Sequence, residues 1–99
     1  MEFTEYTVEK IRDAFGIVQG ERYEFMIEFE VDEEDELYTP QGLLLRVIYS
    51  VDGDNRRIVK HEIIERGSQK VLDFDLEDDE LAETETFCAE HYTEGEILS

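Results

Sequence analysis

The side chains with the greatest chemical potential in this sequence are carboxylates, because Asp and Glu make up 28 of its 99 residues. Glu28 and Glu30 stand two residues apart, which on an extended strand places them on one face at a spacing of about 7 Å. Carboxylates in such rows could imitate a phosphate backbone or attract a basic protein. The acidic side chains that we expect to bind a partner are Glu28, Glu30, Asp32, Glu33, Glu34, Asp35, Glu36, Asp78, Asp79 and Glu80.

The acidic residues could instead bind a metal ion. The segment Asp52–Asn55 contains part of a calcium-loop pattern, but the glycine at the sixth place and the closing glutamate of such a loop are missing. The acids of Glu77–Glu80 would point in different directions around a helix rather than toward one centre. We therefore expect no metal site and no cofactor.

The other groups capable of chemistry are two histidines and one cysteine. Neither His61 nor His91 has a histidine or cysteine neighbour at ligand spacing, so we expect structural or surface roles for both. Cys88 falls in the middle of an apolar stripe, which indicates a buried and unreactive thiol. The serines lack a nucleophile motif. The sequence therefore predicts no catalytic residue, and a protein that is not an enzyme.

The net charge of −19 is unevenly distributed along the chain. It amounts to −10 over residues 1–42, +2 over residues 43–70 and −11 over residues 71–99. Such a field repels nucleic acid and anionic membranes and attracts basic proteins. We therefore expect a basic protein partner and no direct contact with nucleic acid. The near-neutral segment 43–70 offers a second docking face, or a face for forming a homodimer.

A chain of 99 residues is expected to form a single domain, spanning residues 1–99, around one core. Its one cysteine cannot form an internal disulfide, which favours the reducing cytoplasm. The first residues contain neither the basic flank nor the apolar run of a signal peptide. No stretch approaches the roughly 18 apolar residues of a membrane span. We expect a cytoplasmic protein that does not contact membranes.

The most apolar stretch is Leu43–Val51, in which seven of nine residues are apolar. Both odd and even positions are apolar, so both faces of this predicted central strand are expected to be covered. A helix can cover one face. Sheet curvature, the segment Lys10–Val18 or a second subunit are the alternatives for the other face.

Further strands are predicted on both sides of this central strand. Residues 22–31 alternate apolar and charged side chains, with only Met26 out of phase, which predicts one buried face and one solvated face. The other predicted strands are an edge strand at Phe3–Val8, a return strand at Arg57–Glu65, a short last strand at Val71–Phe74 and a short strand through Ile17 and Val18. The predicted turns are Asp13–Gly16, Gln19–Glu21, Thr39–Gly42, Asp52–Asn55 and Gly67–Ser68.

From Asp75 onward the apolar period changes to that of a helix. We expect Asp75 to cap the first turn and Gly95 to end a helix whose 18 residues would span about 27 Å. The residues on its apolar stripe are Leu81, Thr84, Cys88 and Tyr92. The predicted fold class is therefore α+β: a mostly antiparallel meander sheet of about five strands, with one C-terminal helix packed across a face.

Five segments of the chain form a further pattern. They are DAFGIVQGERYEF at Asp13–Phe25, DEEDELY at Asp32–Tyr38, GLLLRVIYSVD at Gly42–Asp52, VLDFDLEDDE at Val71–Glu80 and FCAEHY at Phe87–Tyr92. Together they are similar to a family of small uncharacterised proteins from Bacillus-type Gram-positive bacteria. The resemblance implies a bacterial, cytosolic protein and brings no catalytic motif. Some members carry a pullulanase label, but 99 residues cannot house a glycosidase barrel of about 250 residues.

The sequence thus predicts an uncharacterised small acidic protein that acts as a non-enzymatic protein-interaction or regulatory module. Two alternatives are open. The first is a nucleic-acid mimic that occupies a DNA- or RNA-binding protein, which requires rows of carboxylates on the folded surface. The second is a small enzyme or metal-dependent protein without a recognisable motif, which requires a cleft that brings His61 or His91 near acidic residues.

Overall fold

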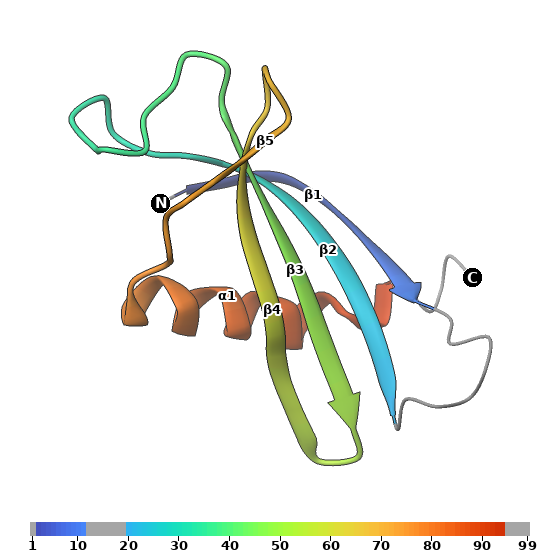
Figure 1. The fold of residues 1–99 in the computed structure, drawn as a ribbon. Coiled ribbons are helices and arrows are strands. Elements are labelled where there is room, and N and C mark those ends of the chain that lie inside the picture. The colour runs from blue at the N-terminus through green and yellow to red at the C-terminus, as the bar shows by residue number, and fades with distance from the viewer. Residues whose placement is uncertain (1, 12–19, 95–99) are drawn as a thin grey trace.

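The computed structural model describes residues 2–11 and 20–94. Its strands form one antiparallel sheet in the order β1-β2-β3-β4-β5, and a helix follows the last strand (Figure 1). The elements are β1 (Glu2–Ile11), β2 (Glu21–Glu30), β3 (Leu43–Asp52), β4 (Asn55–Glu65), β5 (Lys70–Leu72) and α1 (Asp78–His91). The predicted α+β meander with a C-terminal helix is therefore confirmed, and β3 is the central strand.

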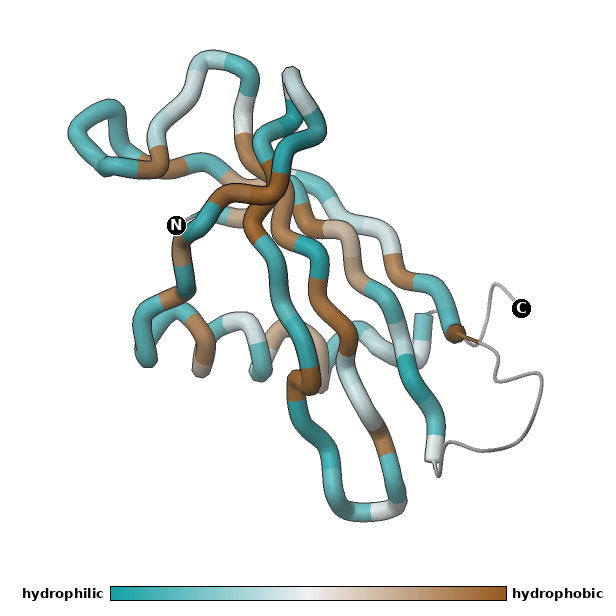
Figure 2. Tube along the Cα trace, in the orientation of Figure 1, coloured by the Kyte–Doolittle hydropathy of each residue, from teal (hydrophilic) through white to brown (hydrophobic). Residues whose placement is uncertain are grey.

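One face of the sheet is apolar and lies against α1. The side chains of Tyr23, Phe25 and Ile27 in β2 are fully buried, and charged side chains occupy most of the alternate positions. The register pairs Phe25 with Val47 and Ile27 with Leu45, so β2 and β3 present one continuous apolar surface. In Figure 2 apolar segments lie in the strands, in α1 and in the connection between β5 and α1, whereas the β2–β3 connection and the β3–β4 turn are mostly hydrophilic.

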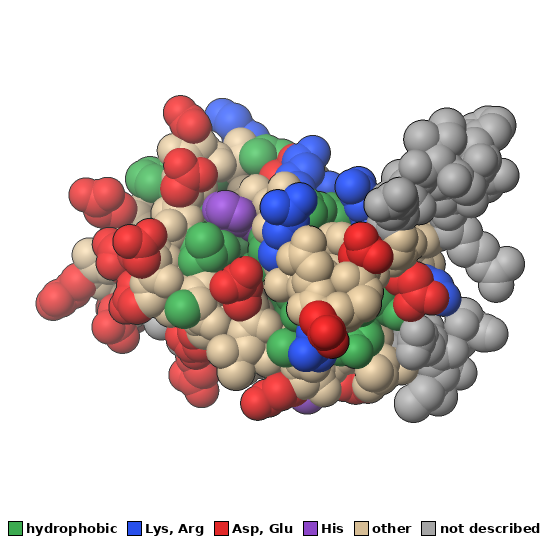
Figure 3. Space-filling view, turned by 90° about the horizontal axis from the view of Figure 1, so that it is seen from below, with side chains coloured by type: hydrophobic (Ala, Val, Ile, Leu, Met, Phe, Trp, Pro, Cys, Tyr) green, Lys and Arg blue, Asp and Glu red, His purple; other side chains and the backbone are tan. Residues whose placement is uncertain are grey.

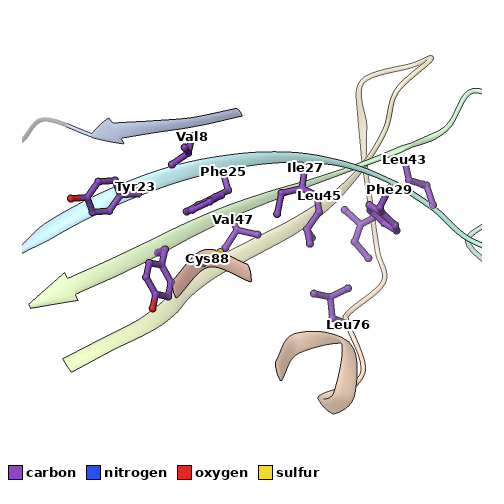
Figure 4. Close-up of a cluster of buried hydrophobic side chains, with 12 residues drawn as sticks. Val8, Tyr23, Phe25, Ile27, Phe29, Leu43, Leu45, Val47, Leu76 and Cys88 are labelled. Carbon is purple, nitrogen blue, oxygen red and sulfur yellow. The ribbon is translucent and has the colours of Figure 1, made fainter. Parts of the chain in front are cut away.

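The helix covers this surface with the predicted stripe. Thr84 and Cys88 are fully buried, and Figure 4 shows Cys88 close to the side chains that extend from the strands. At the edge strand, the ring of Phe87 lies 5.0 Å from that of Phe3 and 4.9 Å from that of Tyr6. Together, α1 and its C-cap residue Tyr92 contact every strand from β1 to β4, so the helix crosses the sheet rather than following β3 (Figure 1).

The opposite face of β3 is covered by long charged side chains. The guanidinium of Arg46 lies 2.7 Å from Glu24 of β2 and 3.8 Å from Glu62 of β4, so one side chain ties three strands together. The aliphatic parts of such side chains can cover apolar surface. Accordingly, Ile48 and Ile64 on this face are only 8% and 9% exposed. Charged side chains of the sheet thus contribute to this cover, a contribution that the sequence did not indicate. Of the alternatives considered from the sequence, the segment Lys10–Val18 lies mostly outside the described residues.

The helix begins later than predicted. Its N-cap is Glu77 rather than Asp75, and the backbone N–H of Glu77 donates to the Glu80 carboxylate at 3.0 Å. The reason is Leu76, which is only 9% exposed and belongs to the core, so the chain stays extended through this residue before it coils. The helix has 14 residues instead of 18. The predicted end at Gly95 lies outside the described residues.

Strand boundaries differ in detail. At both ends β1 is longer than the predicted strand at Phe3–Val8, and β5 ends at Leu72, the last residue that pairs with β4. Gly20 has φ +77°, as expected for the predicted turn beside β2. The predicted turn at Asp13–Gly16 and the strand through Ile17 and Val18 lie outside the described residues.

The cover that Arg46 provides can be tested by two substitutions. We expect Arg46→Ala to lower the free energy of unfolding by about 1–2 kcal/mol, because it removes both the aliphatic stem and the ion pairs. Arg46→Met keeps an apolar stem and should cost less than about 1 kcal/mol, because the ion pairs that it removes are partly exposed to solvent. Urea denaturation measures both. If the two variants are equally destabilised, the charge rather than the stem stabilises this face.

Burial of Cys88 predicts a pH dependence. Desolvation raises the pKa of its thiol from 9.0 to about 12. Above pH 9 the thiol ionises in the unfolded chain but not in the folded one. The stability that it contributes is therefore lost as pH rises from 9 to 12, by about 1.4 kcal/mol per pH unit. The measurement is the difference in unfolding free energy between the wild type and Cys88→Ala. Parallel pH curves for the two proteins would contradict a buried thiol.

Candidate functional site

The acidic segment after β2 has a defined shape. The backbone N–H of Asp35 donates to the carbonyl of Asp32 at 2.9 Å, and that of Tyr38 donates to the carbonyl of Asp35 at 3.0 Å. The Asp35 carboxylate also accepts from the backbone N–H of Leu37, whose side chain packs against the core. Asp32–Glu36 is exposed, as predicted, and two consecutive turns define the course of its backbone.

A second turn returns the chain to β3. The backbone N–H of Gly42 donates to the carbonyl of Thr39 at 3.1 Å, which confirms the turn predicted at Thr39–Gly42. Gly42 adopts φ +86°, a conformation that other residues rarely take. Its carbonyl accepts from the backbone N–H of Arg66, which anchors the turn to the end of β4. The whole β2–β3 connection is therefore tied to the sheet at both ends.

The segment between β5 and α1 faces this connection. Burial of Leu76 places Asp75 and Glu77 on either side of a core residue, near the acidic loop. Together the two segments line a hollow of about 460 Å³, which we call the acidic cleft. Its lining residues are Glu34, Asp35, Glu36, Leu37, Phe74, Asp75, Glu77 and Glu80. Two acidic runs that β3, β4 and β5 separate in the sequence thus meet in space.

The charge of the acidic cleft is not neutralised within the described part of the chain. None of the carboxylates of Asp32–Glu36 or Asp75–Glu80 forms an ion pair with another described residue. Figure 3 shows acidic side chains gathered at the end of the molecule where α1 begins. Charges within the Debye length of about 8 Å at physiological salt reinforce one another. This end therefore carries a concentrated negative potential.

A second acidic hollow adjoins the first. It has a volume of about 280 Å³ and shares Asp35 with the acidic cleft. Its lining residues are Glu2, Glu30, Val31, Asp32 and Asp35. Glu2 was not among the candidates from the sequence, because the predicted first strand began at Phe3. The β1–β2 register places Glu2 opposite Glu30, and only this pairing brings it into the site.

A less polar hollow lies on the other side of the same loop. It has a volume of about 240 Å³ and shares Glu30 and Val31 with the second acidic hollow. We call it the Tyr38 slot. Its lining residues are Phe29, Glu30, Val31, Tyr38, Thr39, Pro40, Gly42 and Leu43. Sequence reasoning identified Pro40 and Gly42 only as turn residues and did not single out Tyr38.

Not every predicted acidic residue belongs to this site. Glu28 lies on the open face of β2, where its carboxylate is 2.6 Å from the guanidinium of Arg66. The predicted row of Glu28 and Glu30 is therefore partly neutralised. Asp78 and Asp79 are exposed in the first turn of α1 and do not line the acidic cleft.

The histidines occupy different environments. His61 is opposite Val47 on the helix-facing side of β4, and its Nε2 is buried with no hydrogen-bond partner among the described residues. His91 lies near the end of α1, where its Nδ1 is within hydrogen-bond distance of Glu94 and 3.2 Å from the Tyr6 hydroxyl. Neither histidine lines the hollows described above.

Tyr6, His91 and Glu94 satisfy one another. The Tyr6 hydroxyl donates to both Glu94 oxygens, at 2.7 and 2.9 Å. This hydrogen bond raises the pKa of Tyr6, and the hydrogen bonds from Tyr6 and His91 lower the pKa of Glu94. The raised pKa keeps the Tyr6 phenol protonated at neutral pH, as its role as hydrogen-bond donor requires. The cluster ties the end of α1 to the edge strand β1.

Residues 2–11 and 20–94 contain no group of three or more His, Cys, Asp or Glu arranged to hold a metal ion. The acidic cleft concentrates carboxylates without converging them on one point. Within the same residues, no helix is long and apolar enough to cross a membrane.

No similar protein was found among curated proteins or among solved structures. The family model DUF6509, described as a family of unknown function, matches residues 1–95. This match carries no activity, and neither the pullulanase label nor the taxonomic range implied by the resemblance receives support from it. Because the match spans nearly the whole chain, this protein belongs to DUF6509, a family of unknown function.

Proposed function

We propose that this protein is a non-enzymatic protein-interaction or regulatory module whose acidic cleft binds a basic segment of a partner protein. The observation that supports the proposal most is the meeting of two acidic runs, Asp32–Glu36 and Asp75–Glu80, around one hollow. The fold places these runs side by side although their charges repel one another. A cationic segment between them would replace repulsion by attraction.

The fixed shape of the loop favours binding. Backbone hydrogen bonds within Asp32–Tyr38 favour the turn conformation of the loop, which lowers the entropic cost of binding a partner. The negative potential of the cleft would also accelerate encounter with a basic partner at low salt. Both effects give the acidic surface a role beyond solubility.

The cleft also has apolar parts. Leu37 forms part of its lining, and Phe74 is 45% exposed at its side. Lysine and arginine have long aliphatic stems that pack on apolar surface while their charged ends contact carboxylates. The proposed ligand is therefore a protein segment with several basic residues. The proposed compartment is the cytoplasm, because a single cysteine cannot form an internal disulfide.

The nucleic-acid mimic alternative requires rows of carboxylates on the folded surface, and the row expected from the sequence lies on β2. Glu24 and Glu28 of β2 are bound by Arg46 and Arg66, which reduces the negative charge of that row. The remaining concentration of acidic residues surrounds hollows at one end of the molecule. This arrangement favours a partner that inserts a short basic segment over a partner whose surface fits a nucleic-acid duplex.

Three neutralising substitutions test the proposal. Glu34→Gln, Glu36→Gln and Asp75→Asn remove charge from the acidic cleft at side chains that form no ion pair. The probe is a fluorescent seven-residue peptide of lysine and arginine with a central serine, followed by anisotropy at low salt. We expect the triple variant to bind about tenfold more weakly, from about 0.5 kcal/mol per surface charge.

A matched control carries the same change in net charge elsewhere. Glu9, Glu83 and Glu90 are exposed and line none of the hollows described above, so their replacement by Gln should weaken binding less than about threefold. Equal losses in the two triple variants would show that only the total charge matters. Absence of any binding by the wild type at low salt would overturn the proposed function.

A further inference from the structure

We infer that the Tyr38 slot receives one large apolar side chain of the bound segment, next to a cation held by the second acidic hollow. This inference rests on the proposed function and adds a rule for which basic segments bind. It predicts that basic charge alone is insufficient for the tightest binding, and that an apolar residue beside the cations is required.

The slot has a mixed lining, and it is the least polar of the three hollows at this end of the molecule. Phe29 and Leu43, each only 2% exposed, are the last and first residues of the apolar face that β2 and β3 share. Val31, Tyr38 and Pro40 add apolar surface around them. An apolar side chain that enters the slot would therefore pack mainly on Val31, Tyr38 and Pro40, with the end of the core beneath them. This gain is hydrophobic and does not depend on salt.

Charge complementarity identifies the occupant. Glu30 and Val31 line both the slot and the second acidic hollow, so the two spaces are adjacent. If one ligand residue enters the slot, the residues next to it in the ligand sequence would lie beside Glu30, Asp32 and Glu2. An acidic or neutral segment would gain nothing there, whereas lysine or arginine would pair with these carboxylates. The ligand is thus a segment in which an apolar residue stands among basic ones.

The size of the slot favours a single side chain. Its volume of about 240 Å³ lies below the range of about 300–1,000 Å³ that is typical of small-molecule sites. Tyr38 is 43% exposed, and its hydroxyl has no hydrogen-bond partner in the described part of the chain. The backbone of Tyr38 is held by its hydrogen bond to Asp35. A half-exposed aromatic ring on a fixed backbone is typical of residues that anchor protein interfaces.

The test compares peptides that differ only at the centre. Three seven-residue peptides carry lysine or arginine at the six outer positions and Phe, Leu or Ser in the middle. We expect the wild type to bind the Phe and Leu peptides about five- to tenfold more tightly than the Ser peptide, from partial burial of the central side chain. The ratio should persist when salt is raised, although all three affinities fall.

Two protein variants make the test specific. Tyr38→Ser should reduce the preference for Phe and Leu to less than about twofold, whereas Val59→Ser, which removes a similarly exposed apolar side chain outside the slot, should keep it. Circular dichroism and urea denaturation verify that both variants fold. An unchanged preference in Tyr38→Ser overturns the inference. Equal binding of all three peptides by the wild type also overturns it but leaves the proposed function standing, whereas no binding of any peptide overturns both.

Discussion

The structure depends on burial of β3 on both of its faces. On one face, Leu45 and Val47 are fully buried against α1. On the other, Arg46 joins β2 to β4 through Glu24 and Glu62, and its stem helps to cover the strand. Within residues 2–11 and 20–94, this arrangement covers the central strand with one helix on one face and charged side chains on the other. It also uses some of the few basic residues of a strongly acidic chain for structure.

That use of basic residues has a consequence for the rest of the surface. Arg46 and Arg66 neutralise carboxylates on the open face of the sheet, while the acidic residues at one end of the molecule remain unpaired among the described residues. The β2–β3 connection and the start of α1 are both attached to the core there, through Leu37 and Leu76. Apolar contacts of Leu37 and Leu76 with the core thus position the two acidic segments.

The sequence predicts most of the fold because each element has a strong local signal. Period two in β2 and the helical stripe that contains Thr84 and Cys88 were sufficient to place the sheet and the helix. The site was harder to predict, since its composition depends on contacts between distant segments. Sequence reasoning grouped Glu28 with Glu30, but pairing with Arg66 depends on the tertiary fold. It placed the helix cap at Asp75 because burial of Leu76 is not a local property.

The central claim is that the acidic cleft is the binding surface, and a nuclear magnetic resonance titration tests it most directly. The ¹⁵N-labelled protein would be mixed with a lysine–arginine peptide at physiological salt while backbone amide shifts are recorded. The account predicts that the largest changes fall at residues 30–38 and 74–80, on both sides of the cleft. Changes spread evenly over the surface, or centred on the β3–β4 hairpin, would contradict it.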